Sequence, residues 1–241
     1  SAADLYWQAV TYGDGLFVAV SISAINYGVM TSPDGVVWTT RALLNTQGGW
    51  QDVTFGNDVF VAVSSTGTGN RVMTFDDYAL LTPAGSIDGL SWQAVTYGNG
   101  LYVAIASDGV GNGVITSLDG ITWNVQASAA DLSWQAITFG NNQYVAVASN
   151  DSGNRVMTSS DGITWTTQLS AADLAWQSIT FGNNKYVAVA SDGVGNGVMT
   201  SSDGITWSTQ ASAADLAWQA VTFGNNVYVA VASDVTGNRV M

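Results

Sequence analysis

The stretch SAADLAWQSITFGNNKYVAVASDGVGNGVMTSSDGITWSTQA, residues 170–211, is one copy of a unit that recurs along the whole chain. Its marker WQ-x-[VI]-T-[FY]-G begins at six tryptophans, spaced by 43 residues once and then by 42: Trp7, Trp50, Trp92, Trp134, Trp176 and Trp218. A fixed period of this length is typical of repeat architectures. The sequence therefore predicts one domain, 1–241, built of repeats at about 1–42, 43–85, 86–127, 128–169, 170–211 and 212–241.

Each repeat is expected to form four short antiparallel strands. In the fifth copy these are residues 176–181, 185–191, 197–201 and 205–210, where β-branched and aromatic residues dominate. A GNN turn joins the first two strands, and a DGVGN loop joins the second to the third. The connector SAADL has room for at most one helical turn, with Ser170 as its N-cap.

The second strand of the repeat indicates how the repeats pack. Tyr186, Ala188 and Ala190 would point to one side, and Val187 and Val189 to the other, so both faces are apolar. A sheet that lies between two other sheets requires two apolar faces. We therefore expect an all-β fold, a six-bladed β-propeller of four-stranded antiparallel blades, with an open solenoid as the alternative.

The segment TSSDGITW, 158–165, returns at 200–207, as TSLDGITW at 116–123 and as TSPDGVVW at 31–38. It resembles the Asp-box, or BNR, repeat of sialidase-type propellers, roughly Ser-x-Asp-x-Gly-x-Thr-Trp, with one residue fewer between Asp and Trp. The resemblance implies a propeller and no particular activity. The matching residues that we expect to be structural are Asp34, Trp38, Asp119, Trp123, Asp161, Trp165, Asp203 and Trp207.

A structural role is expected for this aspartate because of the turn in which it lies. Asp accepts hydrogen bonds from nearby backbone N–H groups, Gly adopts the positive φ that closes the turn, and Trp165 buries apolar area. A catalytic residue is seldom repeated, yet this Asp recurs in five repeats. In the second repeat Asp77 remains, but Tyr78 and Leu81 replace the Gly and the Trp.

The charge balance excludes several classes of partner. The chain has 5 Lys+Arg against 18 acidic residues, all of them Asp, and a net charge of -13. Nucleic acids and anionic membrane surfaces both require clustered basic residues. No apolar run is long enough to insert into a membrane.

Composition also argues against an enzyme, because the chain contains no Glu, no His and no Cys. Sialidases of the resembled family use an Arg triad, a Tyr/Glu nucleophile pair and an acid/base Asp, and the Tyr/Glu pair cannot be built here. A Ser-His-Asp set is impossible without His. Glycoside hydrolysis by two Asp residues is the least favoured function, since no pair differs from the repeated background. No catalytic residue is predicted.

Three arginines recur in the motif GNRVM at a spacing of 84 residues: Arg71, Arg155 and Arg239. They would bind an anion together if they faced a central channel. They lie where the second loop enters the third strand, away from the innermost strand. The favoured interpretation is that each covers a neighbouring surface or pairs with a nearby Asp.

A ligand-binding surface is predicted at the end of the propeller where the connectors and the second loops gather. Aromatic faces beside Asp and Asn suit a sugar ring, although the tryptophans could instead be core residues between blades. Oxygen ligands in the loops 107–113 and 191–197 would suit Ca²⁺, but a full ligand set is lacking, so no cofactor is expected. The candidate ligand-binding residues are Trp92, Trp134, Trp176, Trp218, Asp108, Asn112, Asp192, Asn196, Arg71, Arg155 and Arg239.

These observations lead to two functional hypotheses. The first is a non-catalytic module that recognises glycans at several equivalent sites, by analogy with propeller lectins. The alternative is a structural or adhesive display module of a larger surface or fibre protein that binds protein. A composition rich in Gly, Asn, Ser, Thr and Asp, with little Lys and no Glu, favours a secreted or cell-surface location.

The sixth repeat reaches Met241 with only the start of its third strand, 239–241, where TSSDGITWTTQ would follow. A third strand near Val240 without a neighbour is an edge that tends to pair with another chain. We expect the native polypeptide to extend beyond one end and to supply an outer strand of the DGITWTTQ type. A three-stranded final blade, or a strand donated by another molecule, is the alternative.

Overall fold

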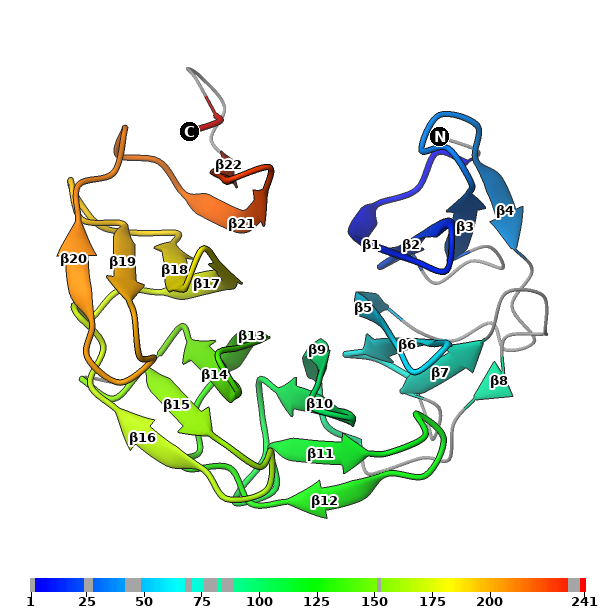
Figure 1. Ribbon diagram of the computed structural model, residues 1–241, viewed down its shortest axis with the longest axis horizontal. Helices are drawn as coiled ribbons and strands as arrows, with labels where there is room; N and C mark the ends of the chain where they lie inside the picture. The colour runs from blue at the N-terminus through cyan, green and yellow to red at the C-terminus, as the bar shows by residue number, and fades with distance from the viewer. Residues whose placement is uncertain are drawn as a thin grey trace. The chain divides into compact units, whose positions relative to one another are not determined.

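The computed structural model describes residues 3–23, 28–41, 49–67, 71–75, 82–83, 89–150, 153–233 and 239–241 (Figure 1). In this part of the chain every regular element is a β-strand. Among the same residues, no helix has the length and apolar character that crossing a bilayer requires. The chain divides into two compact units, Ser1–Gln126 and Ala127–Met241.

The first unit contains three antiparallel four-stranded sheets, named sheets 1 to 3, in which the spatial order of the strands follows the sequence. Their strands are β1 (Trp7–Gly13), β2 (Leu16–Ser21), β3 (Val29–Ser32) and β4 (Thr39–Arg41); β5 (Trp50–Gly56), β6 (Val59–Ser64), β7 (Val72–Phe75) and β8 (Thr82–Pro83); and β9 (Trp92–Gly98), β10 (Leu101–Ala106), β11 (Val114–Ser117) and β12 (Asn124–Gln126). The first strands of successive sheets, β1, β5 and β9, lie against one another.

The second unit repeats this arrangement in sheets 4 to 6, again with the first strands β13, β17 and β21 in contact. Its strands are β13 (Trp134–Gly140), β14 (Gln143–Ala148), β15 (Val156–Ser159) and β16 (Thr166–Gln168); β17 (Trp176–Gly182), β18 (Lys185–Ala190), β19 (Val198–Ser201) and β20 (Ser208–Gln210); and β21 (Trp218–Gly224) and β22 (Val227–Ala232). The predicted four antiparallel strands per repeat are thus confirmed in sheets 1 to 5.

The turn between the first and second strands has the backbone that the GNN sequence predicts. Asn183 and Asn184 have φ angles of 44° and 55°, and Gly182 pairs with Lys185 across the turn. Two successive residues with positive φ define the type I′ hairpin, whose twist matches that of the strands. Asparagine tolerates this conformation better than other residues with a side chain.

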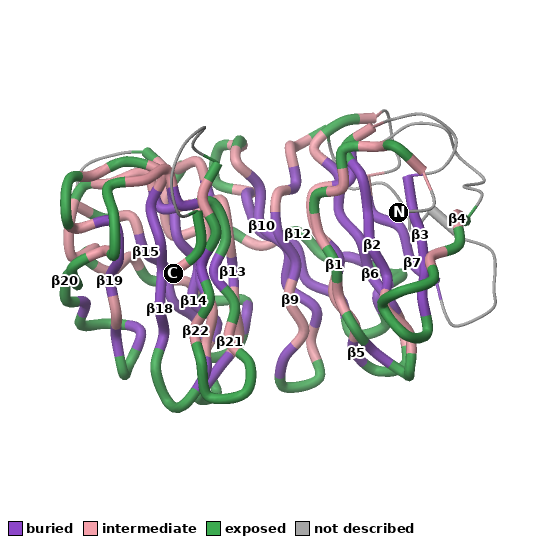
Figure 2. Tube along the Cα trace, turned by 90° about the horizontal axis from the view of Figure 1, so that it is seen from above, coloured by how far each residue is buried: buried purple, intermediate pink, exposed green. Residues whose placement is uncertain are grey.

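The second strand of sheet 5, β18, contributes to two cores, as its alternating pattern predicts. Figure 2 shows β18 as buried. Tyr186, Ala188 and Ala190 pack with residues of sheet 4, including Val145. Val187 and Val189 of the same strand pack with Trp218 and other residues of sheet 6. Sheet 5 therefore lies between two apolar boundaries, which explains why both of its faces are hydrophobic.

A recurrent contact between neighbouring sheets explains the glycine that ends the WQ-x-[VI]-T-[FY]-G marker. A Cβ atom on Gly182 would lie 2.1 Å from the ring of Phe223 in sheet 6, so only glycine allows that ring to approach. The hydroxyl of Tyr228 donates a hydrogen bond to the carbonyl oxygen of Gly182, at 2.5 Å. The same ring-on-glycine contact joins Gly13 to Phe55, Gly56 to Tyr97 and Gly140 to Phe181.

Two details of the predicted secondary structure are wrong. The fourth strand of sheet 5 begins at Ser208 and not at residue 205, because the Asp203 carboxylate binds the N–H groups of Ile205 and Thr206 and holds them in the turn. The connector bends without forming a helical turn, and the Ser170 hydroxyl donates to carbonyl oxygens instead of capping a helix. Asp77, Tyr78 and Leu81 lie outside the described residues.

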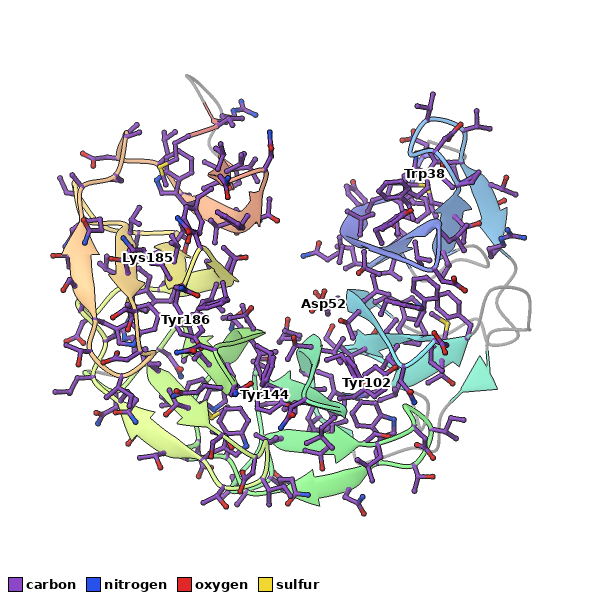
Figure 3. All side chains as sticks on the ribbon, viewed as in Figure 1. Trp38, Asp52, Tyr102, Tyr144, Lys185 and Tyr186 are labelled. Carbon is purple, nitrogen blue, oxygen red and sulfur yellow. The ribbon has the colours of Figure 1, made fainter. Side chains whose placement is uncertain are left out.

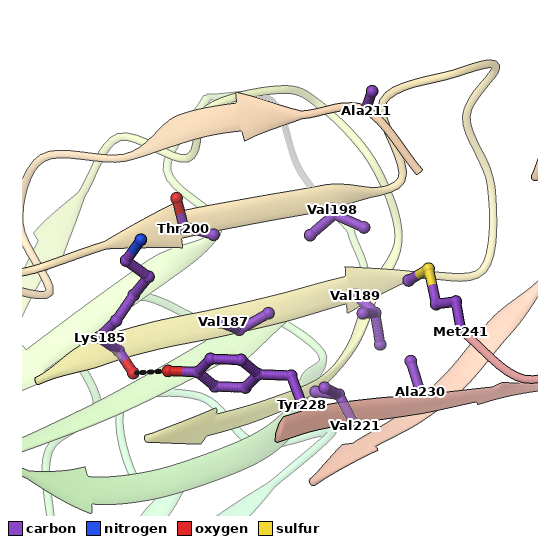
Figure 4. Close-up of a pocket in the computed structure, with 10 residues that line it drawn as sticks. All are labelled: Lys185, Val187, Val189, Val198, Thr200, Ala211, Val221, Tyr228, Ala230 and Met241. Atoms are coloured by element: carbon purple, nitrogen blue, oxygen red, sulfur yellow. Dashed lines mark hydrogen bonds between the residues drawn. The ribbon is translucent and has the colours of Figure 1, made fainter. Parts of the chain in front are cut away.

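Sheet 6 has two strands, followed by a single bridge between Val231 and Val240 that confirms the predicted start of a third strand. A cavity of about 300 Å³ lies beside this bridge, and Val198, Thr200, Tyr228 and Met241 are among its lining residues (Figure 4). In sheet 5 the corresponding tyrosine, Tyr186, has the Trp207 ring 6.3 Å away, between ring centroids. The cavity is therefore the space that an outer-strand tryptophan fills in a four-stranded sheet.

Candidate binding site at the connector end of the sheets

The predicted ligand surface corresponds to a defined end of each sheet, which we name the connector end. It carries the segment before the first strand and the loop between the second and third strands. In sheet 5 these two segments are bonded to each other, since Ser191 N–H donates to Ala175 O at 3.0 Å. The prediction that they gather at one end is confirmed within this sheet.

In sheets 1 to 5, a side-chain acceptor two residues after the second strand fixes the connector. The Asp192 carboxylate accepts from Ala175 N–H at 2.6 Å, and the Asp108 carboxylate accepts from Ser91 N–H at 2.6 Å. Other oxygen-bearing residues do the same in sheets 1, 2 and 4, namely Ser23, Thr66 and Asn150. The residue at this position therefore has a structural role, because its side-chain oxygen holds the connector. Its variation among Asp, Asn, Thr and Ser, which all carry an acceptor oxygen, is the sequence feature that indicates this role.

The tryptophans predicted to bind ligand are core residues, which corrects that prediction. Trp92, Trp134, Trp176 and Trp218 are each at most 1% exposed, so they have no free ring face for a sugar. They start the inner strands, and Trp92, Trp176 and Trp218 pack against neighbouring apolar side chains of their own unit. A large ring at the boundary between two sheets gains more from burial than an exposed ring would.

The indole N–H groups of these tryptophans are also used internally. Those of Trp134, Trp176 and Trp218 donate to connector carbonyl oxygens, four residues earlier, at 3.1–3.3 Å. The indole nitrogen atoms of Trp50 and Trp92 have no partner among the described residues, and the residues four positions before them, 46 and 88, lie outside this set. The tryptophan thus links the connector to the core.

The two identical loops 107–113 and 191–197 have the same backbone conformation. Gly109 and Gly193 have φ angles of 117° and 107°, and Gly111 and Gly195 of 72° and 75°. Gly195 N–H donates to the Asp215 carboxylate of the following connector at 2.5 Å, and Gly153 N–H donates to Asp173 in the same way. The loops are held by the scaffold before any ligand arrives.

Each of these loops presents an apolar tip. Val110 and Val194 are both 86% exposed, whereas the nearby Asn112 and Asn196 are partly buried. The Oδ1 atoms of the two asparagines are enclosed and have no hydrogen-bond partner within the part of the chain that the structure describes. Among the described residues, no group of three Asp side chains is placed to hold a metal ion.

The arginines are placed in the loops, where the sequence predicted them. Arg71 donates through Nε to Gly67 O at 2.9 Å and through a terminal nitrogen to Leu90 O. Its guanidinium thus joins its own loop to the next connector, which agrees with the interpretation that it covers a neighbouring surface. Arg155 is partly buried and Arg239 is exposed, each directly before the third-strand residues of its sheet.

At the opposite end of the sheets, the repeated aspartate forms a closed turn. The Asp161 carboxylate accepts from the N–H groups of Ile163 and Thr164, at 2.8 and 2.7 Å, and from the Ser159 hydroxyl. These backbone hydrogen bonds lower the pKa of Asp161 to about 2. The carboxylate is therefore committed to the turn as a charged acceptor, which is unsuitable for transferring protons near neutral pH.

The same turn occurs in sheets 1, 3 and 5. Asp34, Asp119 and Asp203 accept the equivalent pairs of N–H groups, and these bonds hold their pKa values below the usual range. Gly162 has a φ of 74°, and Trp165 Nε1 donates to its carbonyl oxygen at 3.0 Å. Trp123 and Trp207 are buried, whereas Trp38 and Trp165 are only partly buried.

Asp52 of β5, for which no role was predicted from the sequence, is a carboxylate at the contact between two sheets (Figure 3). Its Oδ2 accepts from Val95 N–H of the next sheet at 2.9 Å, and its Oδ1 accepts from Val53 N–H. Burial raises its pKa to about 7, although the two backbone hydrogen bonds oppose this rise. In sheet 5 the same position is Ser178, whose hydroxyl accepts from Val221 N–H at 3.1 Å. The replacement of Ala by Asp in the marker was the signal that the sequence offered.

No family model matches this chain, and no curated protein matches it. Among solved structures it is similar to virginiamycin B lyase from Staphylococcus aureus, with a TM-score of 0.80 and 13% identity over 96% of this chain and 82% of that one. It is also similar to YCF48 bound to D1 peptide, with a TM-score of 0.68 and 14% identity over 95% and 75% of the two chains. A computationally designed protein, Ika8, gives a TM-score of 0.67 and 16% identity over 96% and 69%.

These identities are too low to transfer an activity, so the similarities inform the fold only. Virginiamycin B lyase and YCF48 are both β-propellers. Together with the repeated four-stranded antiparallel sheets, they show that this chain has a β-propeller fold.

Proposed function

We propose that this chain is a non-catalytic binding module that holds another protein through the loops at its connector end. The observation that carries the proposal is the pair of identical loops, 107–113 and 191–197, with an exposed valine at each tip. Exposed apolar side chains on a fixed backbone are the groups that gain most from desolvation at a protein interface. Repetition of the loop allows several weak contacts to act together.

The side-chain chemistry supports a binding role without catalysis. The chain contains no Glu, no His and no Cys. The aspartates of the repeated turns are engaged by backbone N–H groups, and Asp108 and Asp192 clamp the connectors. Among similar folds, YCF48 forms a complex with a peptide, which is an analogy at the level of fold.

Glycan recognition is the second candidate, and Tyr6 is the observation that favours it. Its side chain is 77% exposed beside the connector end of sheet 1, and an exposed ring is suited to stacking on a sugar. The exposed carboxylates of Asp108 and Asp192 have room for further hydrogen bonds. The candidate sugar-binding residue is therefore Tyr6 and not the buried tryptophans.

We further propose that the six sheets are six blades of one propeller and that the TSSDGITW turns are Asp-box turns. The hydrogen bonds of Asp161 and its equivalents support the second statement, because they are those expected of that turn. A secreted or surface-displayed protein is the setting that we propose for such a low-charge repeat module.

The test is an array that carries both proteins and glycans, probed with labelled wild-type chain. The loop variant is Val110→Asn with Val194→Asn, and the matched control is Ile121→Asn with Ile205→Asn, whose side chains are exposed in the turns at the other end. We expect binding to protein spots that the loop variant reduces at least tenfold and the control leaves unchanged.

Two other outcomes would decide against this proposal. Protein binding that survives the loop variant but is lost in the control would place the interface at the turn end. Binding to glycan spots that is lost in Tyr6→Ser and kept in the loop variant would favour the second candidate.

A further inference from the structure

The two loops of the proposed binding surface carry, besides their exposed valines, exposed carboxylates whose charge the fold does not require. In both loops the residue that holds the connector is an aspartate, Asp108 in sheet 3 and Asp192 in sheet 5, and both are exposed. Uncharged residues accept the equivalent hydrogen bond in sheets 1, 2 and 4, namely Ser23, Thr66 and Asn150, whereas Asp234 of sheet 6 lies outside the described residues. The bond to Asn150 is 2.6 Å long, like that to Asp192, so an amide oxygen holds the connector as closely as a carboxylate does. The negative charge at this position is therefore available to a partner.

The segments around the loop of sheet 5 add further negative charge. The loop 191–197 is hydrogen-bonded to the connector before it, 170–175, and to the connector after it, 212–217. These three segments contain no Lys and no Arg, but they contain three exposed aspartates, Asp173, Asp192 and Asp215. The Asp215 carboxylate accepts from the N–H group that follows Val194 in the chain, at 2.5 Å, so the apolar tip has carboxylates beside it.

The side chain of Gln177 adds an uncharged acceptor next to Asp192. Its Nε2 donates to Ser191 Oγ at 3.0 Å and to Ala175 O at 3.3 Å. Because a carbonyl oxygen only accepts hydrogen bonds, the nitrogen must face Ala175, and this fixes the orientation of the amide. The amide oxygen has no donor among the described residues, and the side chain is partly exposed. It is therefore free to accept a hydrogen bond from a partner.

We propose that the protein held by these loops presents lysine or arginine side chains around an apolar residue. This inference rests on the proposed function and adds the chemistry of the partner. The apolar residue would pack on Val110 or Val194, and the cations would pair with the carboxylates beside these valines. Ammonium and guanidinium groups only donate hydrogen bonds, so they match a surface that offers carboxylate and amide oxygens. A second copy of this chain is a poor partner, because its net charge is also -13.

An array of 12-residue peptides of random sequence, probed with the labelled chain at about 150 mM NaCl, tests this inference. The net charge of -13 attracts basic peptides to any part of the surface, so binding counts only where Val110→Asn with Val194→Asn reduces it. We expect these loop-dependent peptides to be enriched in Lys and Arg, next to Val, Ile, Leu or Phe, relative to the whole array.

The other outcomes of this array separate the inference from the proposed function. Loop-dependent peptides without enrichment of Lys and Arg would overturn the inference and leave the proposed function intact. Peptides that bind the loop variant as well as the wild type would count against both. An array without bound peptides would overturn the inference, and the array of proteins would then decide on the proposed function alone.

A variant that removes charge tests the carboxylates directly. Asp108→Asn with Asp192→Asn removes two charges, and Asn150 shows that an asparagine keeps the connector bond. A loop-dependent basic peptide should bind this variant at least fivefold more weakly at about 50 mM NaCl. The difference should disappear at about 500 mM NaCl, where the charges are screened.

The matched control is Asp14→Asn with Asp58→Asn, which removes two charges from exposed hairpin turns at the other end of the sheets. Asparagine stands at both turn positions in sheet 5, as Asn183 and Asn184, so the turns should be kept. The control should bind the peptide like the wild type. Equal weakening in the variant and the control would show that only net charge matters, and it would overturn the inference. Unchanged binding in the Asp108 and Asp192 variant would overturn it as well.

Discussion

The boundary between sheets 4 and 5 has the same inner-strand contacts as the boundary between sheets 5 and 6. The two boundaries differ in the contacts made by the outer strands. At the first, Val145 and Val156 of sheet 4 are fully buried under a four-stranded neighbour that includes Trp207. At the second, Val187 and Val198 of sheet 5 face the two strands of sheet 6 and a cavity of about 300 Å³. Ring-on-glycine and tyrosine contacts are present at both.

The difference separates two tasks within the repeat. The two inner strands set the relative position of neighbouring sheets, since Phe223 and Tyr228 reach Gly182 without help from outer strands. The outer strands close the apolar boundary against water, because the tryptophan and methionine that complete it come from there. We therefore expect that loss of outer-strand contacts lowers the free energy of unfolding. The relative position of neighbouring sheets should change little, because the inner strands determine it.

The largest effect is expected for Trp207→Ala, which would make the first boundary resemble the second. Loss of a buried ring of this size costs about 3–5 kcal/mol of unfolding free energy. Urea denaturation measures it, with Ile205→Ala, a half-exposed neighbour, as the control expected to stay within about 0.5 kcal/mol. Equal losses in the two variants would show that the boundary does not depend on Trp207.

The turn that positions this tryptophan should contribute less. Asp203→Ala and Asp161→Ala each remove the acceptor of two backbone N–H groups, at a cost on the order of 1–3 kcal/mol. Because the folded pKa of Asp161 is about 2 and thus lowered, its stabilisation is present above pH 4 and is lost as the pH falls towards 2. Wild type and variants should converge in stability in acid, and a constant difference down to pH 2 would refute the charged-acceptor role.

The repeat length, the strand segments, the two apolar faces and the GNN turn could be predicted from the sequence, because each depends on local residue type and on a period of two. The role of the tryptophans could not be decided in the same way. An aromatic residue at the start of a strand suits both a core and a sugar site, and only the position of the neighbouring sheet shows that Trp176 is covered.

Contacts between sheets escaped the sequence analysis for a related reason. The partners of Gly182 and of Asp52 lie 41 and 43 residues away, one repeat further along the chain. In near-identical repeats such a pairing is invisible, since every copy carries the same residues and no position stands out. The exception, Asp52, was visible as a departure from Ala, but its burial and its acceptor role required the structure.

The boundary between sheets 2 and 3 has the Asp52 carboxylate at the position where the boundary between sheets 5 and 6 has the Ser178 hydroxyl. The folded pKa of Asp52, about 7, is raised, so its contribution is fully present below pH 4 and is lost as the pH rises through 7. Allowing for its partial exposure, the loss is on the order of 2 kcal/mol. Asp52→Ser should abolish this part of the pH dependence, as followed by urea unfolding between pH 4 and 8. An unchanged profile would show that Asp52 ionises normally.

An added peptide with the sequence of an outer strand should make the boundary between sheets 5 and 6 resemble the boundary between sheets 4 and 5. The peptide TSSDGITWSTQ, residues 200–210, offers a strand next to the bridged Val240 and a tryptophan for the cavity. At ten times its dissociation constant, a bound peptide stabilises the fold by about 1.4 kcal/mol. Thermal unfolding should shift upward with this peptide and not with the Trp→Ala version of it. Equal shifts would mean that the cavity is not the binding site.

The smallest effect tests whether water enters the second boundary. Tyr186→Phe removes a hydrogen bond to Gly140 O, and Tyr228→Phe removes the equivalent bond to Gly182 O, each 2.5 Å long. Tyr186 is fully buried, and its burial raises its pKa to about 12, so its loss leaves a carbonyl that water does not reach, at a cost of about 1 kcal/mol. Tyr228 is less buried, and water can replace its hydroxyl, so its loss should cost less than half as much.

Phe17 and Phe60, at this position in sheets 1 and 2, show that the repeat tolerates the change. Equal costs in the two variants, measured by urea unfolding, would mean that the second boundary, with the two strands of sheet 6 on one side, is as dry as the first.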